Sequence, residues 1–409
     1  MLQLMKTTTA FVAALMVSYT TIAQDIGSKL QFAFTQFEKD AQLQSAIASL
    51  YVIDAKTGKV VFDKNGDIGL APASTQKIIT AATAYAMLGK AFRYQTGFAY
   101  TTNGNTATLY IQPSGDPTLG SWRWEANNEE SVMKRLAAAA KPLQGKTVDK
   151  VVVDAKGWNS ESIPDGWIWQ DIGNYYGAGA AALNWRENQF DLHLQSGPGI
   201  GDDVKVANTK PHLYGVKFQS QATAAAKGTG DNAYIYYPLQ SNILLLRGTI
   251  PAGENKFVIS GAMPQPHHQF AYTLAEALKG KTDVSENIVP VYNYTNNTKA
   301  TVFHTEYSPV MDSIVYWFNR KSINLYGEAL VKTFGLQKKG EAETGEGVDV
   351  LKDFWKEQGI AATELNMVDG SGLSPLNRVT TRAQVKVLQY AQKQSWYGGF
   401  YNSLPEFNG

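Results

Sequence analysis

Apolar residues along the chain follow helical spacing near both ends and strand-like spacing in the middle. Near the N-terminus, residues 28–44 predict an amphipathic helix. The run S-L-Y-V-I-D-A-K-T-G-K-V-V-F-D predicts a β-hairpin that turns at residues 55–58. Residues 74–88 then predict a buried helix, because Lys77 is the only charged residue between Leu70 and Gly89.

From about residue 92 to residue 300, short apolar runs alternate with Gly, Asn and Thr, which is typical of strands and turns. One helix is predicted inside this stretch, at residues 129–140. After Pro309 the helical spacing returns. Four helices are predicted there, at residues 310–318, 323–334, 346–358 and 381–394.

This pattern predicts a discontinuous helix-rich domain, formed by residues 24–91 and 301–409. A mostly β insertion at residues 92–300 divides it, with residues about 121–190 as a candidate nested subdomain. A chain of 409 residues is long enough for such a division, because single hydrophobic cores rarely grow that large.

Residues 1–23 have the features of a signal peptide. Lys6 supplies the positive charge, A-F-V-A-A-L-M-V is a short apolar run, and small residues precede a cleavage site after Ala23. The apolar run is shorter than the ~20 residues that a membrane span needs. We therefore expect an exported protein without a transmembrane anchor, in the periplasm or at the surface of a bacterium.

Composition narrows the class of protein further. Hydrophobic residues make up 44% of the chain and charged residues 18%, as in soluble globular proteins. The formal charge is +1 and no long basic run occurs, which argues against a nucleic-acid partner. Cysteine is absent, so no disulfide forms. The pair His267-His268 is interpreted as a polar turn in a loop, so we expect neither a metal site nor a cofactor.

The stretch A-P-A-S-T-Q-K places a serine three residues before the lone lysine. Positions i and i+3 share one face of a helix, so Lys77 can reach back over Ser74. The helix N-terminus adds free N–H groups and partial positive charge. Burial lowers the pKa of a lysine and lets it accept a proton. These features predict that Ser74 is a nucleophile and Lys77 its base.

The Ser-x-x-Lys pattern also occurs at S131-V-M-K134. That copy is flanked by acidic and basic residues on a helix predicted to be solvated, so we interpret it as a chance match. A second element supports the first copy, because Ser322-Ile323-Asn324 stands where a helix is predicted to begin. There a hydroxyl can relay a proton and an amide can hold a substrate. A similar Ser-Glu-Asn at residues 285–287 lies in a polar stretch and is discounted.

The combination of S-T-Q-K and S-I-N resembles the penicillin-binding proteins and serine β-lactamases. The long insertion between the motifs, with the stretches V-I-D-A-K-T-G-K-V-V-F, S-G-D-P-T-L and D-G-S-G-L-S, is similar to the D-alanyl-D-alanine carboxypeptidase/endopeptidase family of class C penicillin-binding proteins. The resemblance runs from about residue 28 to the end. It implies an α/β (α+β) transpeptidase-like fold and a penicillin-sensitive serine peptidase that acts on peptidoglycan peptides, with β-lactams as covalent inhibitors.

The resemblance also implies roles for single residues. Ser74 would attack the D-Ala-D-Ala bond, Lys77 would take its proton, Ser322 would pass a proton to the leaving D-alanine, and Asn324 would hold the acyl side of the substrate. The backbone N–H of Ser74 would form half of an oxyanion hole. Residues expected to bind substrate are Asp171 and Tyr176 of the insertion and Asp369 and Ser371 of D-G-S-G. For each of these four a purely structural role is the alternative.

One motif of that family is missing. A Lys or His, then Ser or Thr, then Gly should follow Asn324, but Glu343-Thr344-Gly345 lacks the cation. Lys56-Thr57-Gly58 matches in type, but it precedes the nucleophile and fits the hairpin turn. We therefore expect that the natural chain continues past Gly409, and that the given length is less stable and a poor catalyst. A serine β-lactamase and a catalytically silent cell-wall peptide-binding homologue remain the alternatives.

Overall fold

The computed structural model describes residues 26–159, 161–238, 243–278, 283–284 and 299–406. The signal peptide predicted at residues 1–23 and the discounted Ser-Glu-Asn at 285–287 lie outside the described residues. No helix in the described ranges is long and apolar enough to cross a bilayer.

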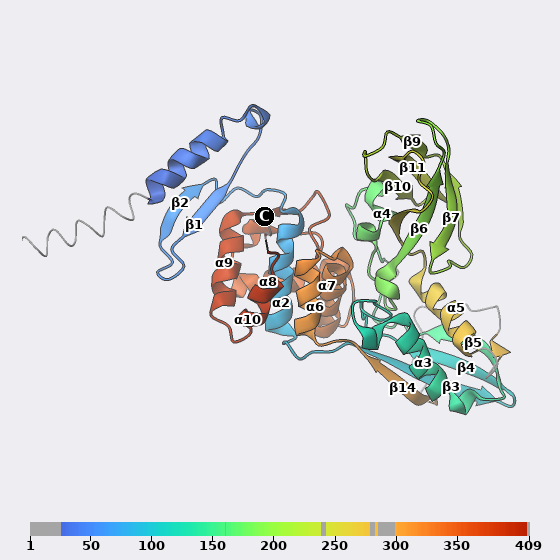
Figure 1. The fold of residues 1–409 in the computed structure, drawn as a ribbon. Helices are drawn as coiled ribbons and strands as arrows, with labels where there is room; N and C mark the ends of the chain where they lie inside the picture. Colours follow the sequence, from blue (N-terminus) through green and yellow to red (C-terminus); the bar gives the residue numbers. More distant parts are fainter. Residues whose placement is uncertain (1–25, 160, 239–242, 279–282, 285–298, 407–409) are drawn as a thin grey trace, which may run out of the picture.

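Ten helices and sixteen strands are described (Figure 1). The helices are residues 26–37, α2 Lys77–Met87, α3 Glu129–Ala139, α4 Trp169–Ile172, α5 Pro266–Leu278, α6 Met311–Arg320, α7 Asn324–Lys339, α8 Thr344–Glu357, α9 Thr381–Gln392 and α10 Tyr397–Ser403. The strands are β1 Leu50–Ile53, β2 Val60–Lys64, β3 Gln95–Asn103, β4 Thr106–Gln112, β5 Thr147–Val153, β6 Gln189–Ser196, β7 Val204–Lys210, β8 Lys217–Ser220, β9 Thr223–Ala225, β10 Asn232–Tyr236, β11 Ile243–Pro251, β12 Phe257–Ala262, β13 Asp283–Val284, β14 Thr301–Tyr307, β15 Leu365–Asn366 and β16 Arg378–Val379.

Helices α2 and α6 to α10 form one unit at the centre of the molecule (Figure 1). Four of them, α6 to α9, correspond to the four helices that the sequence predicts after Pro309. Helices α7 and α8 approach closely because Gly347 of α8 packs directly against the backbone of α7. A Cβ at Gly347 would lie 1.8 Å from the carbonyl oxygen of Val331. The apolar faces of this unit share one buried core, which fixes α2 and α7 against each other.

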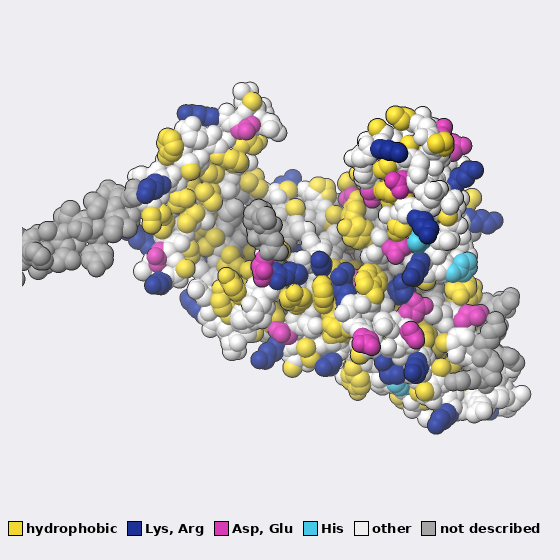
Figure 2. All heavy atoms as spheres, viewed as in Figure 1, with side chains coloured by type: hydrophobic (Ala, Val, Ile, Leu, Met, Phe, Trp, Pro, Cys, Tyr) yellow, Lys and Arg dark blue, Asp and Glu magenta, His cyan; other side chains and the backbone are white. Residues whose placement is uncertain are grey.

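The N-terminal helix and the β1–β2 hairpin lie beside this unit, and β1 is in contact with α9 (Figure 1). The hairpin turns where predicted, because Asp54 Oδ1 accepts the N–H of Lys56 at 3.0 Å and that of Thr57 at 2.7 Å. The helix predicted at 28–44 is shorter and is followed by a separate 3-10 turn, Ala41–Leu43. Large apolar side chains stay exposed on this part of the molecule (Figure 2), at Ile26, Phe32, Phe37, Ile47 and Val60.

The first sheet of the insertion has five strands in the order β13-β5-β4-β3-β14. Strand β3 is its entry and β14 its exit, and the two are antiparallel neighbours with Gln95 opposite Tyr307. The insertion predicted to end at residue 300 therefore includes β14 in its sheet. Just beyond this pair, Ser308 N donates to Tyr94 O at 3.1 Å and Met311 N to Phe92 O at 2.8 Å. Both ends of the insertion thus reach the helical unit at the same place.

The remaining strands, β6 to β12, form two further sheets, ordered β12-β6-β7 and β10-β11-β8, with β9 paired to β11. This second β unit begins at Gln189, whereas the candidate subdomain at 121–190 contains α3 and β5, of which β5 is a strand of the first sheet. Helix α5 was not predicted, and His267 and His268 lie in its first turn rather than in a loop. One buried cluster of apolar residues joins both β units.

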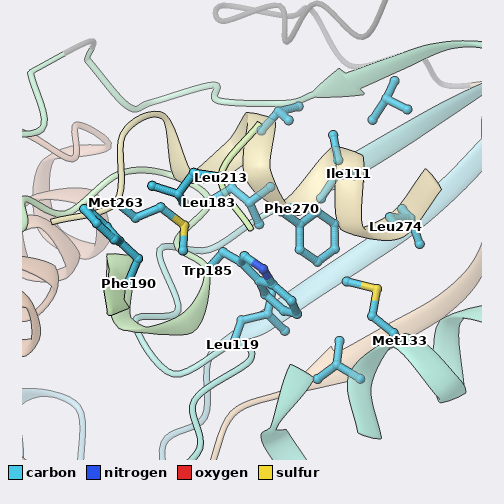
Figure 3. Packing of buried hydrophobic residues seen from close by; sticks show 14 of the residues in the cluster. Ile111, Leu119, Met133, Leu183, Trp185, Phe190, Leu213, Met263, Phe270 and Leu274 are labelled. Atoms are coloured by element: carbon cyan, nitrogen blue, oxygen red, sulfur yellow. The ribbon is translucent and has the colours of Figure 1, made fainter. Parts of the chain in front are cut away.

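Trp185 lies at the centre of that cluster (Figure 3). Its ring meets Phe270 edge-on with the centroids 4.9 Å apart. On another side it covers Gly120, where an added Cβ would lie 2.5 Å from the ring. The side chain is fully buried, so it fills space that no water can enter.

Replacing Trp185 by alanine is expected to lower the free energy of unfolding by about 3–5 kcal/mol, because it leaves a large cavity. Urea denaturation followed by circular dichroism measures the change. Ile200→Ala is the matched control, since Ile200 is 75% exposed and its loss opens no cavity. Equal effects of the two substitutions would contradict the central place of Trp185 in the core.

Candidate active site

Ser74 lies in a 3-10 turn, Ala73–Gln76, which runs directly into α2 at Lys77. The sequence predicts a helix from residue 74, so the regular α-helix begins three residues later than expected. Ala73 has a φ of +44°, an uncommon value for a residue with a side chain. The turn leaves Ser74 exposed, whereas Lys77 is only 2% exposed. The nucleophile candidate therefore faces solvent and the base candidate the interior.

The Lys77 ammonium group has three hydrogen-bond acceptors. Nζ donates to Ser74 Oγ at 3.0 Å, to Asn324 Oδ1 at 2.7 Å and to the carbonyl oxygen of Ser371 at 2.8 Å. Burial lowers the pKa of Lys77 to about 8, although the charges of Glu328 and Asp369 act in the opposite direction. A lysine with this pKa holds its proton less firmly than a solvent-exposed one and can exchange it near neutral pH.

Ser322 and Asn324 meet this pair from the start of α7. Ser322 has a φ of +54°, and its hydroxyl donates to Ser74 Oγ at 2.8 Å. A left-handed backbone at a non-glycine residue is costly and is found mostly where the surrounding structure enforces it. Asn324 Nδ2 donates to the carbonyl oxygen of Tyr176 at 2.8 Å, which ties α7 to the insertion. The structure thus brings all four motif residues together.

The D-G-S-G-L-S stretch forms a buried loop behind Lys77. The Asp369 carboxylate is fully buried and accepts five hydrogen bonds. The donors are Gln76 Nε2, Trp167 Nε1, Asn377 Nδ2 and the backbone N–H groups of Gly372 and Ser374. Ser371 is also fully buried, and its carbonyl oxygen reaches the site through Lys77. Neither side chain is exposed.

Glycine is required where this loop meets its neighbours. Gly372 has a φ of +85°, and a Cβ there would lie 2.0 Å from the carbonyl oxygen of Ala73. At Gly370 a Cβ would lie 2.2 Å from the carbonyl oxygen of Gly327 on α7. Thr80 Oγ1 of α2 donates to Gly370 O at 2.7 Å. The loop is therefore fitted between α7 and the Ser74 turn, backbone against backbone.

A cavity of about 310 Å³ opens in front of Ser74. Its walls include Ser74, Ser322, Asn324, Tyr175, Tyr176 and Arg123. Asp171 is not among the residues that line this cavity, and it accepts a hydrogen bond from the Tyr176 hydroxyl. Burial raises the pKa of both groups, and the charge of Asp171 adds to the rise at Tyr176. Of this predicted pair, only Tyr176 lines the cavity.

Sequence reasoning did not single out Arg123 and Glu187, which also line this cavity. The buried Glu187 Oε1 accepts Arg123 Nε at 2.8 Å and the Tyr326 hydroxyl of α7 at 2.8 Å. The Arg123 guanidinium also lies over the Trp317 ring, 5.2 Å from its centroid. For Arg123 the signal available in the sequence was the position of S-W-R-W one residue after S-G-D-P-T-L.

The two candidates for the missing third motif lie elsewhere. Lys56, Thr57 and Gly58 form the hairpin turn, as the sequence suggests, and Glu343 precedes α8. Neither set lines the cavity in front of Ser74 in the described part of the chain. The second Ser-x-x-Lys pattern lies on α3, with Lys134 exposed. In the described ranges no three His, Asp or Glu side chains gather as a metal site would require.

Comparisons with known proteins agree with the predicted fold. The D-alanyl-D-alanine carboxypeptidase of Actinomadura sp. (strain R39) is 25% identical over 402 residues, which cover 94% of this chain and 70% of that protein. The D-alanyl-D-alanine carboxypeptidase DacB of Haemophilus influenzae is 23% identical over 341 residues, covering 82% and 69%.

The crystal structure of penicillin-binding protein 4 (dacB) from H. influenzae superposes with a TM-score of 0.71 at 21% identity, covering 87% of this chain and 77% of that one. This match confirms the predicted α/β fold of the penicillin-binding protein type. The family model described as the D-Ala-D-Ala carboxypeptidase 3 (S13) family matches residues 30–406. The predicted family is thereby confirmed, and the chain belongs to the D-Ala-D-Ala carboxypeptidase 3 (S13) family of peptidases.

Proposed function

We propose that this protein is a serine-type D-Ala-D-Ala carboxypeptidase and endopeptidase that acts on peptidoglycan stem peptides through an acyl-enzyme on Ser74. One observation carries the proposal: Ser74 Oγ is the meeting point of Lys77 Nζ at 3.0 Å and Ser322 Oγ at 2.8 Å. A nucleophile in hydrogen-bond reach of a base, which is oriented in turn by further groups, is the arrangement of covalent catalysis. Membership of a carboxypeptidase family supports the same reaction.

In the acylation step, neutral Lys77 takes the proton of Ser74 as Oγ attacks the carbonyl carbon of the penultimate D-alanine. The backbone N–H of Ser74 supplies half of the oxyanion hole. As the peptide bond breaks, Lys77 returns the proton through Ser322 to the leaving nitrogen, which departs as the amine of D-alanine. The bond between the Ser322 and Ser74 hydroxyls supports this route. Water then attacks the ester and releases the shortened peptide.

Asn324 has two functions in this proposal. Its Oδ1 holds Lys77 and one N–H of its Nδ2 holds Tyr176 O. A primary amide has two N–H donors, so the second one is available to the acyl side of the substrate. Asp171 and Tyr176 are proposed to read the diamino-acid end of the stem peptide, with Tyr176 in contact and Asp171 orienting its hydroxyl. For Asp369 and Ser371 we propose a supporting role behind Lys77, because both side chains are buried.

β-Lactams are the proposed covalent inhibitors. A solved structure of H. influenzae penicillin-binding protein 4, 20% identical with a TM-score of 0.65, is a complex with a β-lactam. The related enzymes are bacterial D-alanyl-D-alanine carboxypeptidases. Together with the N-terminal sequence, this supports export to the periplasm or the cell surface.

The test is to treat the protein, purified from its native source, with benzylpenicillin and to measure its intact mass. We expect one stable adduct on Ser74, no adduct on Ser74→Ala, and release of D-alanine from a D-Ala-D-Ala peptide by the wild-type protein alone. Rapid turnover of penicillin would indicate a β-lactamase instead. Binding of muropeptide without any adduct would indicate a silent binding homologue.

A further inference from the structure

Glu328 is a buried carboxyl group that the proposed reaction does not use. It lies on α7 one helical turn after Asn324, and its side chain is 0% exposed. One oxygen, Oε2, accepts the backbone N–H of Gly370 at 3.1 Å. The Ser371 side chain also hydrogen-bonds the carboxyl group, and Oε1 is buried without a close hydrogen-bond partner among the described residues. A fully buried carboxyl group with few hydrogen bonds is costly, so its retention at this position calls for a reason.

Glu328 and Lys77 hold adjacent residues of the same loop. Lys77 Nζ donates to the carbonyl oxygen of Ser371, and Glu328 accepts the N–H of Gly370. Lys77 also donates to Asn324 Oδ1, on the same face of α7 as Glu328. The carboxylate and the ammonium group thus approach the loop from α7 and from α2, in an interior that screens charge weakly.

Two other charged groups face Glu328. Asp369 of the loop raises its pKa by repulsion, and Lys332 lies one turn further along α7. Lys332 is itself held by the carbonyl oxygen of Glu161 at 2.6 Å, and the charges of Glu161 and Glu343 act on it. Lys332 therefore has its own acceptor.

The pKa values of Glu328 and Lys77 meet near neutrality. Burial, with the charge of Asp369, raises the pKa of Glu328 to about 8, and burial lowers that of Lys77 to about 8. Each group stabilises the charged form of the other, since the charge of Glu328 raises the pKa of Lys77 and that of Lys77 lowers the pKa of Glu328. Two groups coupled in this way lose protons over a shared range of pH.

We propose that Glu328 is a positioning residue that acts as the counter-ion of Lys77, and that it sets the basicity of Lys77 and so the pH range in which Ser74 is activated. This inference rests on the proposed function, because it assumes that Lys77 takes the Ser74 proton. Without the Glu328 charge, the effect of burial on the pKa of Lys77 would be opposed by the charge of Asp369 and no longer by that of Glu328, so Lys77 would become a weaker base. A weaker base removes a hydroxyl proton less effectively.

The test is the rate of acylation by benzylpenicillin as a function of pH, in the wild-type protein and in Glu328→Gln. Lys77 must be neutral to accept a proton, so the rate falls as the pH drops through the pKa of Lys77. Removing the carboxylate charge lowers that pKa. We expect the acid limb of the profile to move to lower pH by about one unit. The plateau rate should fall at the same time, since the base is weaker.

Thr333→Val is the matched control, because Thr333 is a buried neutral residue on α7 that donates to Ala329 O and contacts the Tyr94 hydroxyl. It should lower stability without moving the limb. If the acid limb of the Glu328→Gln profile stays at the same pH as in the wild-type protein, the inference is overturned. If Glu328→Gln does not fold, the wild-type profile decides: a limb spread over two coupled protonations supports the inference, and a single-proton limb overturns it. A wild-type protein that is not acylated at any pH would refute the proposed function instead.

Discussion

Replacing Lys77 by methionine is expected to lower the rate of acylation by benzylpenicillin about 10²–10⁴-fold, the range by which a positioned base accelerates proton transfer. Methionine keeps the length and apolar character of the side chain but cannot accept the Ser74 proton. Asn324 Oδ1 and the carbonyl oxygen of Ser371 also lose their donor, so some loss of stability should accompany the loss of rate. The time course of adduct formation, followed by intact mass, measures the effect.

The chain contains its own control for this experiment. Lys134 stands three residues after Ser131 in the second Ser-x-x-Lys pattern, but it is exposed on α3. Lys134→Met should acylate at the wild-type rate. If Lys77→Met also acylated at that rate, the base would have to be another group and the role given to Lys77 would be wrong.

Gly372→Ala is expected to lower the free energy of unfolding by about 2–4 kcal/mol and to slow acylation as well. The backbone at Gly372 has a φ of +85°, which disfavours a side chain, and the new Cβ would lie 2.0 Å from the carbonyl oxygen of Ala73. Relief of that overlap must displace either the loop or the turn that carries Ser74. Urea denaturation and the acylation rate, measured on the same variant, test both effects.

Gly345→Ala is the matched control for Gly372→Ala. Gly345 lies in the first turn of α8, and outside its own helix backbone and chain neighbours no atom of the described residues lies within 4 Å of an added Cβ. The substitution should leave stability unchanged or raise it slightly. A Gly372→Ala protein as stable as this control would mean that the loop yields without strain. An unstable Gly372→Ala variant with normal acylation would mean that the loop stabilises the fold but does not position the turn that carries Ser74.

The sequence predicts the local parts of the site well because they depend on local spacing. Ser74 and Lys77 are three residues apart and meet on one face of the turn, and Asn324 opens a helix where the pattern changes. Local spacing does not predict that the two motifs contact each other, because 248 residues separate Ser322 from Ser74. Only the resemblance to a family with both motifs brought these segments together before the structure did.

The division of the insertion is hard to predict because strand pairing is not encoded in periodicity. Strand β14 has an ordinary strand pattern, and nothing in that pattern shows that it pairs with β3 rather than belonging to the helical domain. The same holds for the candidate subdomain at 121–190, because its strand β5 joins a sheet whose other strands lie before and after it in sequence. Helix α5 did carry a helical signal, in Phe270, Leu274 and Leu278, which the surrounding strands obscured.

Glu328 and Lys332 were missed because burial by other elements is invisible in a local pattern. Both follow Asn324 at intervals of four residues and look like the polar stripe of a surface helix. In the structure this stripe is enclosed, and both side chains are fully buried. A sequence of this kind distinguishes a solvated charge from a buried one only when the packing partners are known.

The neighbouring positions of strands β3 and β14 affect how this fold can change over evolutionary time. The chain enters and leaves the insertion at one place, where Tyr94 and Ser308 are joined by a backbone hydrogen bond. Parts of the insertion that do not line the cavity in front of Ser74 can be lengthened, shortened or exchanged without pulling α2 away from α6, since insertions are tolerated where their ends lie close together. The hydrolytic centre and the accessory lobes can therefore diversify at different speeds within one lineage.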